Sequence, residues 1–156
     1  MHVLNQILQW NFILVTALVS WFIAQIVKTL FNWMICRKVD ISRMWGDGGW
    51  PSAHSATVCA MVAATARVEG LNSTMFAIAA VVAIITMHDA MGVRRQTGEQ
   101  AKVLNQLISE WLDQGAQKLP ILGDKQLKEM VGHTPIEVIS GAILGFLVGF
   151  LMPMAI

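Results

Sequence analysis

The sequence has few charged residues. Asp, Glu, Lys and Arg together make up 13% of its 156 residues, whereas 55% are hydrophobic. A soluble domain has about a quarter of its residues charged, so this balance argues against an ordinary water-soluble protein. The formal net charge of +1 also lacks the basic excess typical of nucleic-acid binding, and we expect no nucleic-acid partner. The composition predicts a membrane protein.

Cysteines and clustered metal ligands are also scarce. The two cysteines, Cys36 and Cys59, are too few for a disulfide framework. The four histidines do not follow the spacing of zinc ligands, and the acidic residues do not cluster as calcium ligands do. We therefore expect no metal and no resident cofactor, while phosphate or vanadate could occupy an oxyanion site.

Long apolar runs are what the sequence does contain. They predict an all-α fold, with about four membrane-spanning helices in a single membrane domain over residues 1–156. The expected spans are about 10–35, 52–68, 74–88 and 135–153. No Lys or Arg precedes the first run, in contrast to the basic start of a cleaved signal peptide, so we expect this run to remain as a spanning helix.

Residues 97–115 follow a different pattern. Apolar residues recur there at helical spacing, and Thr97 with Gln100 forms a capping-box pattern. The opposite face is polar, which predicts a cytoplasmic amphipathic helix that lies along the membrane surface or against a partner. A short polar helix is expected over 124–130.

The last expected span carries Gly141, Gly145 and Gly149 at intervals of four residues. Small residues at this spacing allow two helices to approach closely in a membrane. We therefore expect the stripe to pack on another helix, with a second copy of the chain as one candidate. A homodimer is the corresponding prediction for the assembly.

Basic residues are distributed unevenly along the chain. Outside the expected spans they fall in the loops after the first and third spans, and Arg67 lies on the opposite side. The positive-inside rule then places both termini outside and both basic loops in the cytoplasm. The prediction is an integral protein of a bacterial-type plasma membrane.

Three polar stretches, at 48–56, 88–96 and 132–138, adjoin the spans on the same predicted cytoplasmic face. In the first, GGWPSAHSA, Gly49 allows the backbone to approach a ligand closely, and a new helix offers unpaired N–H groups to an anion. A helix cap that happens to contain a histidine explains the same residues equally well. The convergence of all three stretches on one face favours a site.

The residue types in these stretches suit phosphoryl transfer to histidine. One imidazole would attack phosphorus while a carboxylate orients it, and a second imidazole would protonate the leaving oxygen. Arginines and backbone N–H groups would neutralise the phosphate. A serine nucleophile fits less well, because it requires a strand–turn–helix elbow that a helical chain does not offer.

The stretches also resemble the motifs of a known superfamily. Residues 49–55, GWPSAHS, look like the P-S-G-H motif of lipid phosphatases and vanadium haloperoxidases. His133, with Glu137 four residues later, resembles the third motif of that superfamily. The chain is similar to the divergent membrane branch of the type-2 phosphatidic acid phosphatase superfamily, which implies a phosphatase acting on a lipid phosphate or an isoprenyl or other lipid diphosphate.

The resemblance implies a role for each matching residue. His133 would be the nucleophile that forms a phosphohistidine, Glu137 its orienting carboxylate, and His54 the general acid. Ser52 and the nearby backbone would bind the phosphate, with Gly49 as an accessory residue. The superfamily core has six helices, so a four-span chain would be trimmed or completed by dimerisation.

The cations of the superfamily are only loosely matched. The first motif, a lysine seven residues before an Arg-Pro pair, has no counterpart, and Lys28 or Lys38 with Arg43 is a loose substitute. Leu127 stands where the arginine of the third motif is expected. Arg94 or Arg95 would replace that arginine from another loop.

Several of these residues also have simpler interpretations. Lys28 could extend its ammonium to the membrane interface, and Thr134 with Glu137 could cap a helix that begins at Pro135. The paired arginines could mark topology or bind anionic lipid, and Asp89 could pair with one of them as a structural clamp. A non-catalytic lipid-phosphate binding or transport protein, or a structural membrane subunit, is the corresponding functional alternative.

Overall fold

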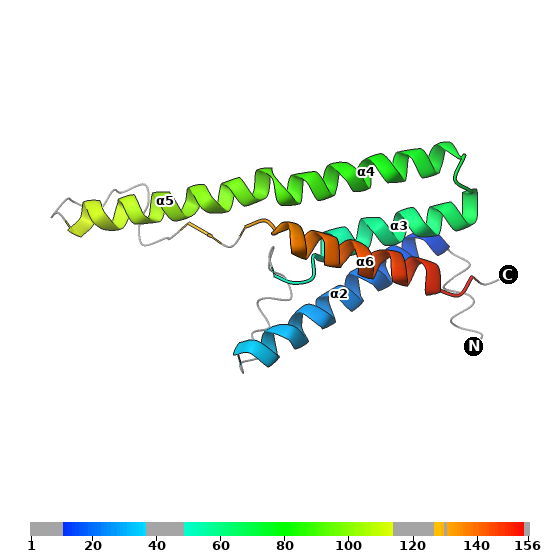
Figure 1. Cartoon of the computed structure of the whole chain (residues 1–156), viewed down its shortest axis with the longest axis horizontal. Helices are drawn as coiled ribbons and strands as arrows, with labels where there is room; N and C mark the ends of the chain where they lie inside the picture. Colours follow the sequence, from blue (N-terminus) through cyan, green and yellow to red (C-terminus); the bar gives the residue numbers. More distant parts are fainter. Residues whose placement is uncertain (1–10, 37–48, 114–126, 130, 155–156) are drawn as a thin grey trace.

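The computed structural model describes residues 11–36, 49–113, 127–129 and 131–154. In this part of the chain all regular secondary structure is helical, which confirms the all-α prediction. The helices are α2 (Phe12–Cys36), α3 (Ala53–Glu69), α4 (Thr74–Met91), α5 (Val93–Asp113) and α6 (Pro135–Leu151). Figure 1 shows α2, α3, α4 and α6 gathered in one bundle, with α5 extending beyond it.

Helix α3 forms the centre of the bundle, and α2, α4 and α6 all contact it. Its sequence explains this position, because nine of its 17 residues are buried and most of these are alanine or another small residue. Small side chains bring the backbones of neighbouring helices close together. The hydroxyl of Ser20 on α2, for example, donates a hydrogen bond of 3.0 Å to the carbonyl oxygen of Ala56.

The glycine stripe of α6 packs on α3 of the same chain. A Cβ atom at Gly141 would collide with the carbonyl oxygen of Ser52, and one at Gly145 with the carbonyl oxygen of Ala56. A Cβ atom at Gly149 would come too close to Cβ of Ala63 and to the carbonyl oxygen of Ala60. The suggestion that a second copy of the chain covers this stripe is therefore wrong, because α3 already occupies it.

Both described termini of the chain lie at one end of the bundle (Figure 1). Arg67 holds the helices together at this end. Its guanidinium donates hydrogen bonds of 2.7 Å to the carbonyl oxygens of Gly149 and Met152, which close the last turn of α6. The same group lies 5.3 Å from the centre of the Phe12 ring at the start of α2. Arg67 thus ties three helices together, opposite the end where the polar stretches lie.

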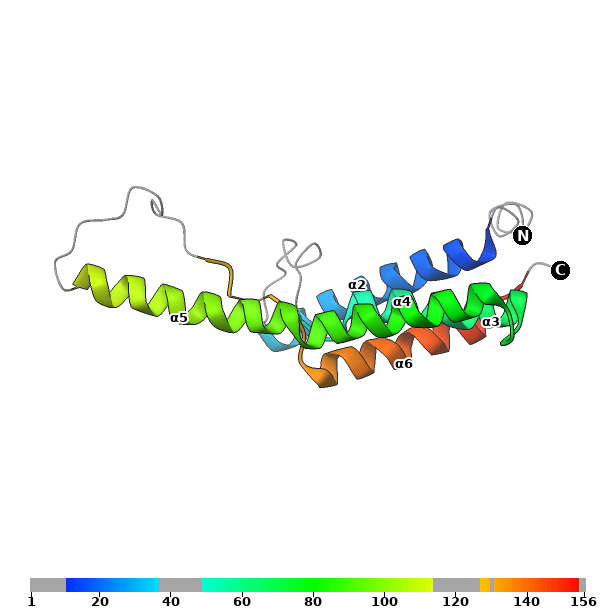
Figure 2. The same ribbon diagram turned by 90° about the horizontal axis from the view of Figure 1, so that it is seen from above.

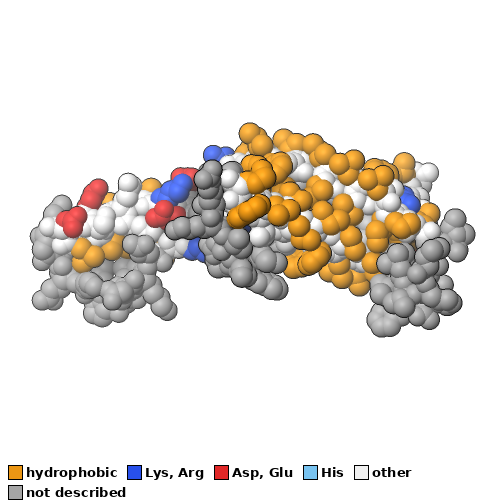
Figure 3. Space-filling model, turned by 90° about the horizontal axis from the view of Figure 1, so that it is seen from below, with side chains coloured by type: hydrophobic (Ala, Val, Ile, Leu, Met, Phe, Trp, Pro, Cys, Tyr) orange, Lys and Arg blue, Asp and Glu red, His pale blue; other side chains and the backbone are white. Residues whose placement is uncertain are grey.

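Two described helical stretches are long and apolar enough to cross a membrane, Phe12–Met34 and the stretch Thr74–Asp113 that begins with α4. Helix α6 is apolar but shorter. Its 17 residues span roughly 25 Å at 1.5 Å per residue, against a hydrocarbon core of about 30 Å. Figure 3 shows hydrophobic side chains over the bundle, whereas charged side chains gather over α5 and its junction with the bundle.

Helix α5 begins earlier than the sequence predicted. Gly92 ends α4, and α5 starts directly after it at Val93 instead of at residue 97. Thr97 therefore lies inside the helix, where its hydroxyl donates to the carbonyl oxygen of Val93 at 3.0 Å, and the predicted Thr97–Gln100 cap is wrong. Helix α5 continues in nearly the direction of α4 (Figures 1 and 2), so it does not lie across the end of the bundle.

A non-helical segment returns along α5 toward α6. Residues 127–129 are not helical, so the short helix predicted over 124–130 is wrong where the structure describes it. The Asn105 amide donates to the carbonyl oxygen of Leu127 at 2.9 Å and to Glu129 Oε1 at 2.8 Å, and its oxygen accepts from Leu127 N. Gly98 on α5 lies against the backbone of Glu129 and Val131.

Candidate functional site

The three polar stretches meet at one end of the bundle. The backbone N–H of His133 donates to the carbonyl oxygen of Ala90 at the end of α4, at 3.0 Å. The N–H of Ser52, just before α3, donates to the carbonyl oxygen of Glu137 in the first turn of α6, also at 3.0 Å. These two bonds join the start of α3, the end of α4 and the start of α6, so segments far apart in the sequence present their side chains together.

Two imidazoles and one carboxylate form the centre of the site. The rings of His54 and His133 lie 6.2 Å apart, with an angle of 62° between their planes. His133 is 4% exposed, and its Nδ1 lies 3.4 Å from Glu137 Oε2. That distance is long for a hydrogen bond, so the carboxylate lies beside the imidazole without a short bond to it. His54 is exposed.

Glu137 also caps α6, as one interpretation of the sequence held, and the same side chain lies beside His133. Its Oε2 accepts a hydrogen bond of 2.8 Å from Thr134 N, and the Thr134 hydroxyl accepts from Glu137 N at 3.4 Å. Pro135 stands at the first turn, where its fixed φ suits a helix start. The capping box fixes the carboxylate beside His133, which lies just before the helix.

The surroundings of His133 lower its pKa below the ordinary histidine value. Burial is the main cause, because it disfavours the charged imidazolium. The nearby Glu137 carboxylate raises this pKa, while Lys28 and His54 lower it. The net result favours a neutral His133 at neutral pH, which leaves a ring nitrogen with a free lone pair.

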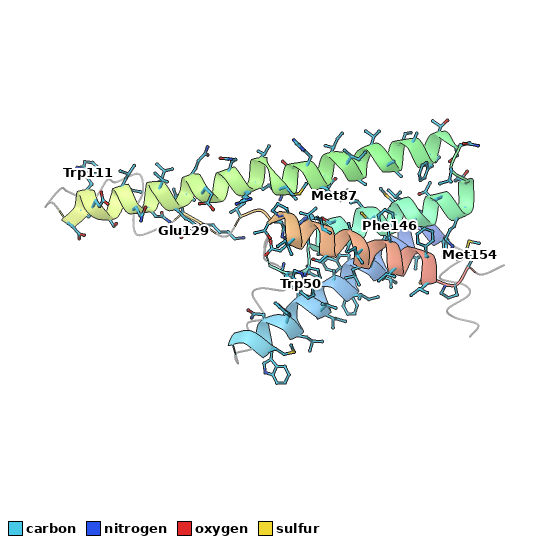
Figure 4. The ribbon with its side chains drawn as sticks, viewed as in Figure 1. Trp50, Met87, Trp111, Glu129, Phe146 and Met154 are labelled. Carbon is cyan, nitrogen blue, oxygen red and sulfur yellow. The ribbon has the colours of Figure 1, made fainter. Side chains whose placement is uncertain are left out.

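Lys28 is buried inside the site end of the bundle. Lys28 is only 6% exposed, so its side chain does not reach out to the membrane interface. Lys28 lies beside Gly49, and the ring of Trp50 packs on Phe31 of α2 with ring centres 4.7 Å apart. The segment before α3 is thereby held against α2 (Figure 4).

A cavity of about 220 Å³ opens next to His133 and Glu137. Its other wall comes from α5 and the returning segment and includes Arg95, Lys102 and Glu129. Figure 4 shows Glu129 below α5, on the segment that leads to α6. The sequence did not single out Lys102 or Glu129, because only the return of the chain along α5 brings them to the site.

The two arginines differ in their surroundings. Arg95 lines the cavity, whereas Arg94 Nε donates to Asp89 Oδ2 at 2.7 Å across the junction of α4 and α5. Asp89 is therefore a clamp for Arg94, as one interpretation of the sequence held. Arg95 is therefore the arginine at the cavity, and Arg94 is the arginine that pairs with Asp89.

Ser52 and Gly49 complete the first polar stretch. Ser52 is fully buried, and its hydroxyl accepts from Ser55 N at 3.3 Å and from Ser55 Oγ at 3.0 Å, as an N-cap of α3. A phosphate contact through this hydroxyl stays a prediction. Gly49 lines the cavity. Lys38 and Arg43 lie outside the described residues.

Among the residues that the structure describes, no three His, Cys, Asp or Glu side chains come together as a metal site would require. His133 lies beside His54 and the Glu137 carboxylate, and Arg95 and Lys102 line the same cavity as His133 and Glu137. This set can bind an oxyanion and move a proton.

Comparison with known proteins adds evidence on the relationships of the sequence. A profile described as the divergent PAP2 family matches residues 9–148. The "Uncharacterized membrane protein YuiD" of Bacillus subtilis (strain 168) is 41% identical over 143 residues, which cover 88% of this chain and 90% of that protein. No solved structure matches the chain.

Proposed function

The chain belongs to the divergent PAP2 family of membrane proteins, and from that premise we propose that it is a lipid-phosphate phosphatase. The reaction would be metal-independent hydrolysis of a phosphate or diphosphate monoester on a lipid, through a phosphohistidine intermediate. The observation that carries the proposal is the placement of His54 6.2 Å from His133, close enough for both imidazoles to contact one phosphate group.

In the first step, a nitrogen of neutral His133 attacks phosphorus and the bond from phosphorus to the lipid oxygen breaks. His54 donates its proton to that oxygen, so the lipid leaves as an alcohol or, from a diphosphate, as a monophosphate. Glu137 holds the imidazole and stabilises the positive charge that develops on it. The lowered pKa of His133 supports this assignment, because only the neutral imidazole is nucleophilic.

In the second step, water takes the place of the leaving group. His54, now neutral, accepts a proton from the water as its oxygen attacks phosphorus, and the nitrogen–phosphorus bond breaks to release phosphate and His133. Arg95 and Lys28 neutralise the non-bridging oxygens throughout. Ser52 acts chiefly as the helix cap that places His54 on the first turn of α3.

The proposed setting is a bacterial-type plasma membrane, crossed by α2, α3, α4 and α6, with the site on the cytoplasmic face. The exposed apolar side chains of α2, α4 and α6 support membrane insertion. Because the family core has six helices, the four-span chain would act as a homodimer. Membrane lipids and a phosphorylated lipid are the proposed partners.

The experiment that tests the activity is phosphate release from a panel of lipid phosphates by purified protein in the presence of a chelator. Wild type should turn over without added metal. His133→Ala and His54→Ala should each lower the rate by at least about 10²-fold, since each removes a nucleophile or a general acid. Full activity in either variant would contradict the two-histidine mechanism.

A non-catalytic lipid-phosphate binding or transport protein is the alternative, favoured by the missing first motif. Arg95→Ala distinguishes it, with Arg94→Ala as the matched control on the neighbouring residue. A binder would release no phosphate, would still bind phosphorylated lipid in vesicles, and would lose affinity in Arg95→Ala more than in Arg94→Ala. A structural subunit would neither release phosphate nor bind the lipid.

A further inference from the structure

Gly49 adopts a backbone conformation that side chains rarely tolerate, and it does so where it touches Lys28. Its φ is +94°, in the region that favours glycine. A Cβ atom added there would lie 3.1 Å from Cε of Lys28, the methylene that carries the ammonium, and 3.8 Å from Cγ. The space that a side chain would need is therefore taken up by the lysine.

Lys28 sits on α2, an apolar helix, and it is buried instead of facing lipid. Ionisable residues that lie in an apolar membrane helix and face the interior of the bundle mark functional positions. Two facts place this cation near the reacting groups. Gly49, which contacts Lys28, also lines the cavity beside His133 and Glu137, and the charge of Lys28 lowers the pKa of His133.

We propose that Gly49 is a positioning residue, whose missing side chain allows the Lys28 ammonium to lie beside His133 and bind the phosphate of the substrate. The inference rests on the proposed function, because phosphate is the ligand that Lys28 would bind during the reaction. It assigns Gly49 a role through Lys28, beyond the close backbone approach that the motif alone suggests.

Gly70 provides a matched control. Its φ is +83°, similar to that of Gly49, but a Cβ atom there would meet nothing within 4 Å. It caps the opposite end of α3, away from the site. Gly49→Ala and Gly70→Ala therefore carry a similar backbone cost, and only the first should displace Lys28.

The experiment measures vanadate binding to the purified full-length protein in detergent micelles, together with phosphate release. Gly49→Ala should weaken vanadate binding about tenfold, a change of about 1.4 kcal/mol, whereas Gly70→Ala should stay within about twofold of wild type. Lys28→Met should match the loss in Gly49→Ala. The double variant should lose no more than Lys28→Met alone, because two residues acting through one contact are not additive.

A pH profile separates displacement of Lys28 from general loosening. Lys28 lowers the pKa of His133, so Gly49→Ala and Lys28→Met should both move the acid limb of vanadate binding to higher pH, and Gly70→Ala should not. Equal behaviour of Gly49→Ala and Gly70→Ala would overturn the proposal. If Gly49→Ala does not fold, wild-type affinity and pH profile in Lys28→Met would overturn it. A wild type that neither binds vanadate nor releases phosphate would instead refute the proposed function.

Discussion

Glu137 serves two partners with one carboxylate. The oxygen that accepts from Thr134 N also faces His133 Nδ1, at 2.8 Å and 3.4 Å respectively. Glutamate has a longer arm than aspartate, and here its position is fixed by the cap at the start of α6. The cap and the proposed catalytic dyad therefore share one carboxylate, whose position is fixed by the start of α6.

The pH dependence of activity should report this arrangement. Because the pKa of His133 is lowered, the acid limb of kcat/KM should lie below the ordinary histidine value of about 6.5. Glu137→Gln removes the group that raises this pKa, so the limb should move to still lower pH, and kcat should fall by roughly 10²–10⁴-fold as orientation is lost. Steady-state rates across pH would measure both.

Thr134→Ala is the control for that variant. It should cost about 1 kcal/mol of stability through the lost cap and leave the acid limb in place. An acid limb in Glu137→Gln that is unchanged or moves to higher pH would refute the assigned role of Glu137.

The stability of the fold should also depend on pH. The free energy of unfolding should decline as pH falls below about 6.5, because the unfolded chain then binds a proton that buried His133 resists.

At the level of elements, the contact between α3 and α6 holds the site together. The contact is formed by alanines on α3 and glycines on α6. Because these side chains are small or absent, the two backbones touch. This close approach brings Ser52 to Glu137 and therefore places the starts of both helices side by side. A change in the middle of the contact should affect the site at its end.

Gly145→Ala tests that contact. The added Cβ would collide with the carbonyl oxygen of Ala56, so we expect a loss of about 1–3 kcal/mol of stability from overpacking and a lower rate of phosphate release. Ile143→Ala on the exposed face of the same helix should stay within about 0.5 kcal/mol. Thermal unfolding in detergent would compare the two, and equal melting temperatures would show that the contact tolerates a side chain.

At the level of the whole molecule, the chain divides into an apolar bundle and a polar extension. Helix α5 prolongs the direction of α4 beyond the bundle (Figures 1 and 2). Both described chain ends lie at the end held by Arg67, and the site lies at the other. An even number of crossings would produce this arrangement, with the site and α5 on the basic side, which the positive-inside rule predicts to be cytoplasmic.

Cysteine labelling in intact cells should reveal that orientation. In a variant without Cys36 and Cys59, Asn72→Cys in the α3–α4 turn should react with a membrane-impermeant reagent added outside. Gln106→Cys on α5 should react only after the cells are permeabilised. Both positions are exposed, so the difference reports the membrane and not burial. Ready labelling of Gln106→Cys in intact cells would reverse the predicted topology.

The sequence alone determined the features that depend on neighbouring residues. Apolar runs specify helices, Thr134 and Glu137 specify a cap, and the three motifs identify the family and its two histidines. Each of these signals lies within a few turns of one helix, where local geometry decides the structure.

The tertiary structure decided what depends on distances between helices. Lys28 could face lipid or the site, either arginine could serve the cavity, and the glycine stripe could pack on any helix. The fold settles these choices because α3 fills the stripe, Asp89 holds Arg94, and the space above Gly49 admits Lys28. Side chains such as Lys102 and Glu129 reach the site only through the return of the chain along α5, and no local pattern in the sequence encodes that return.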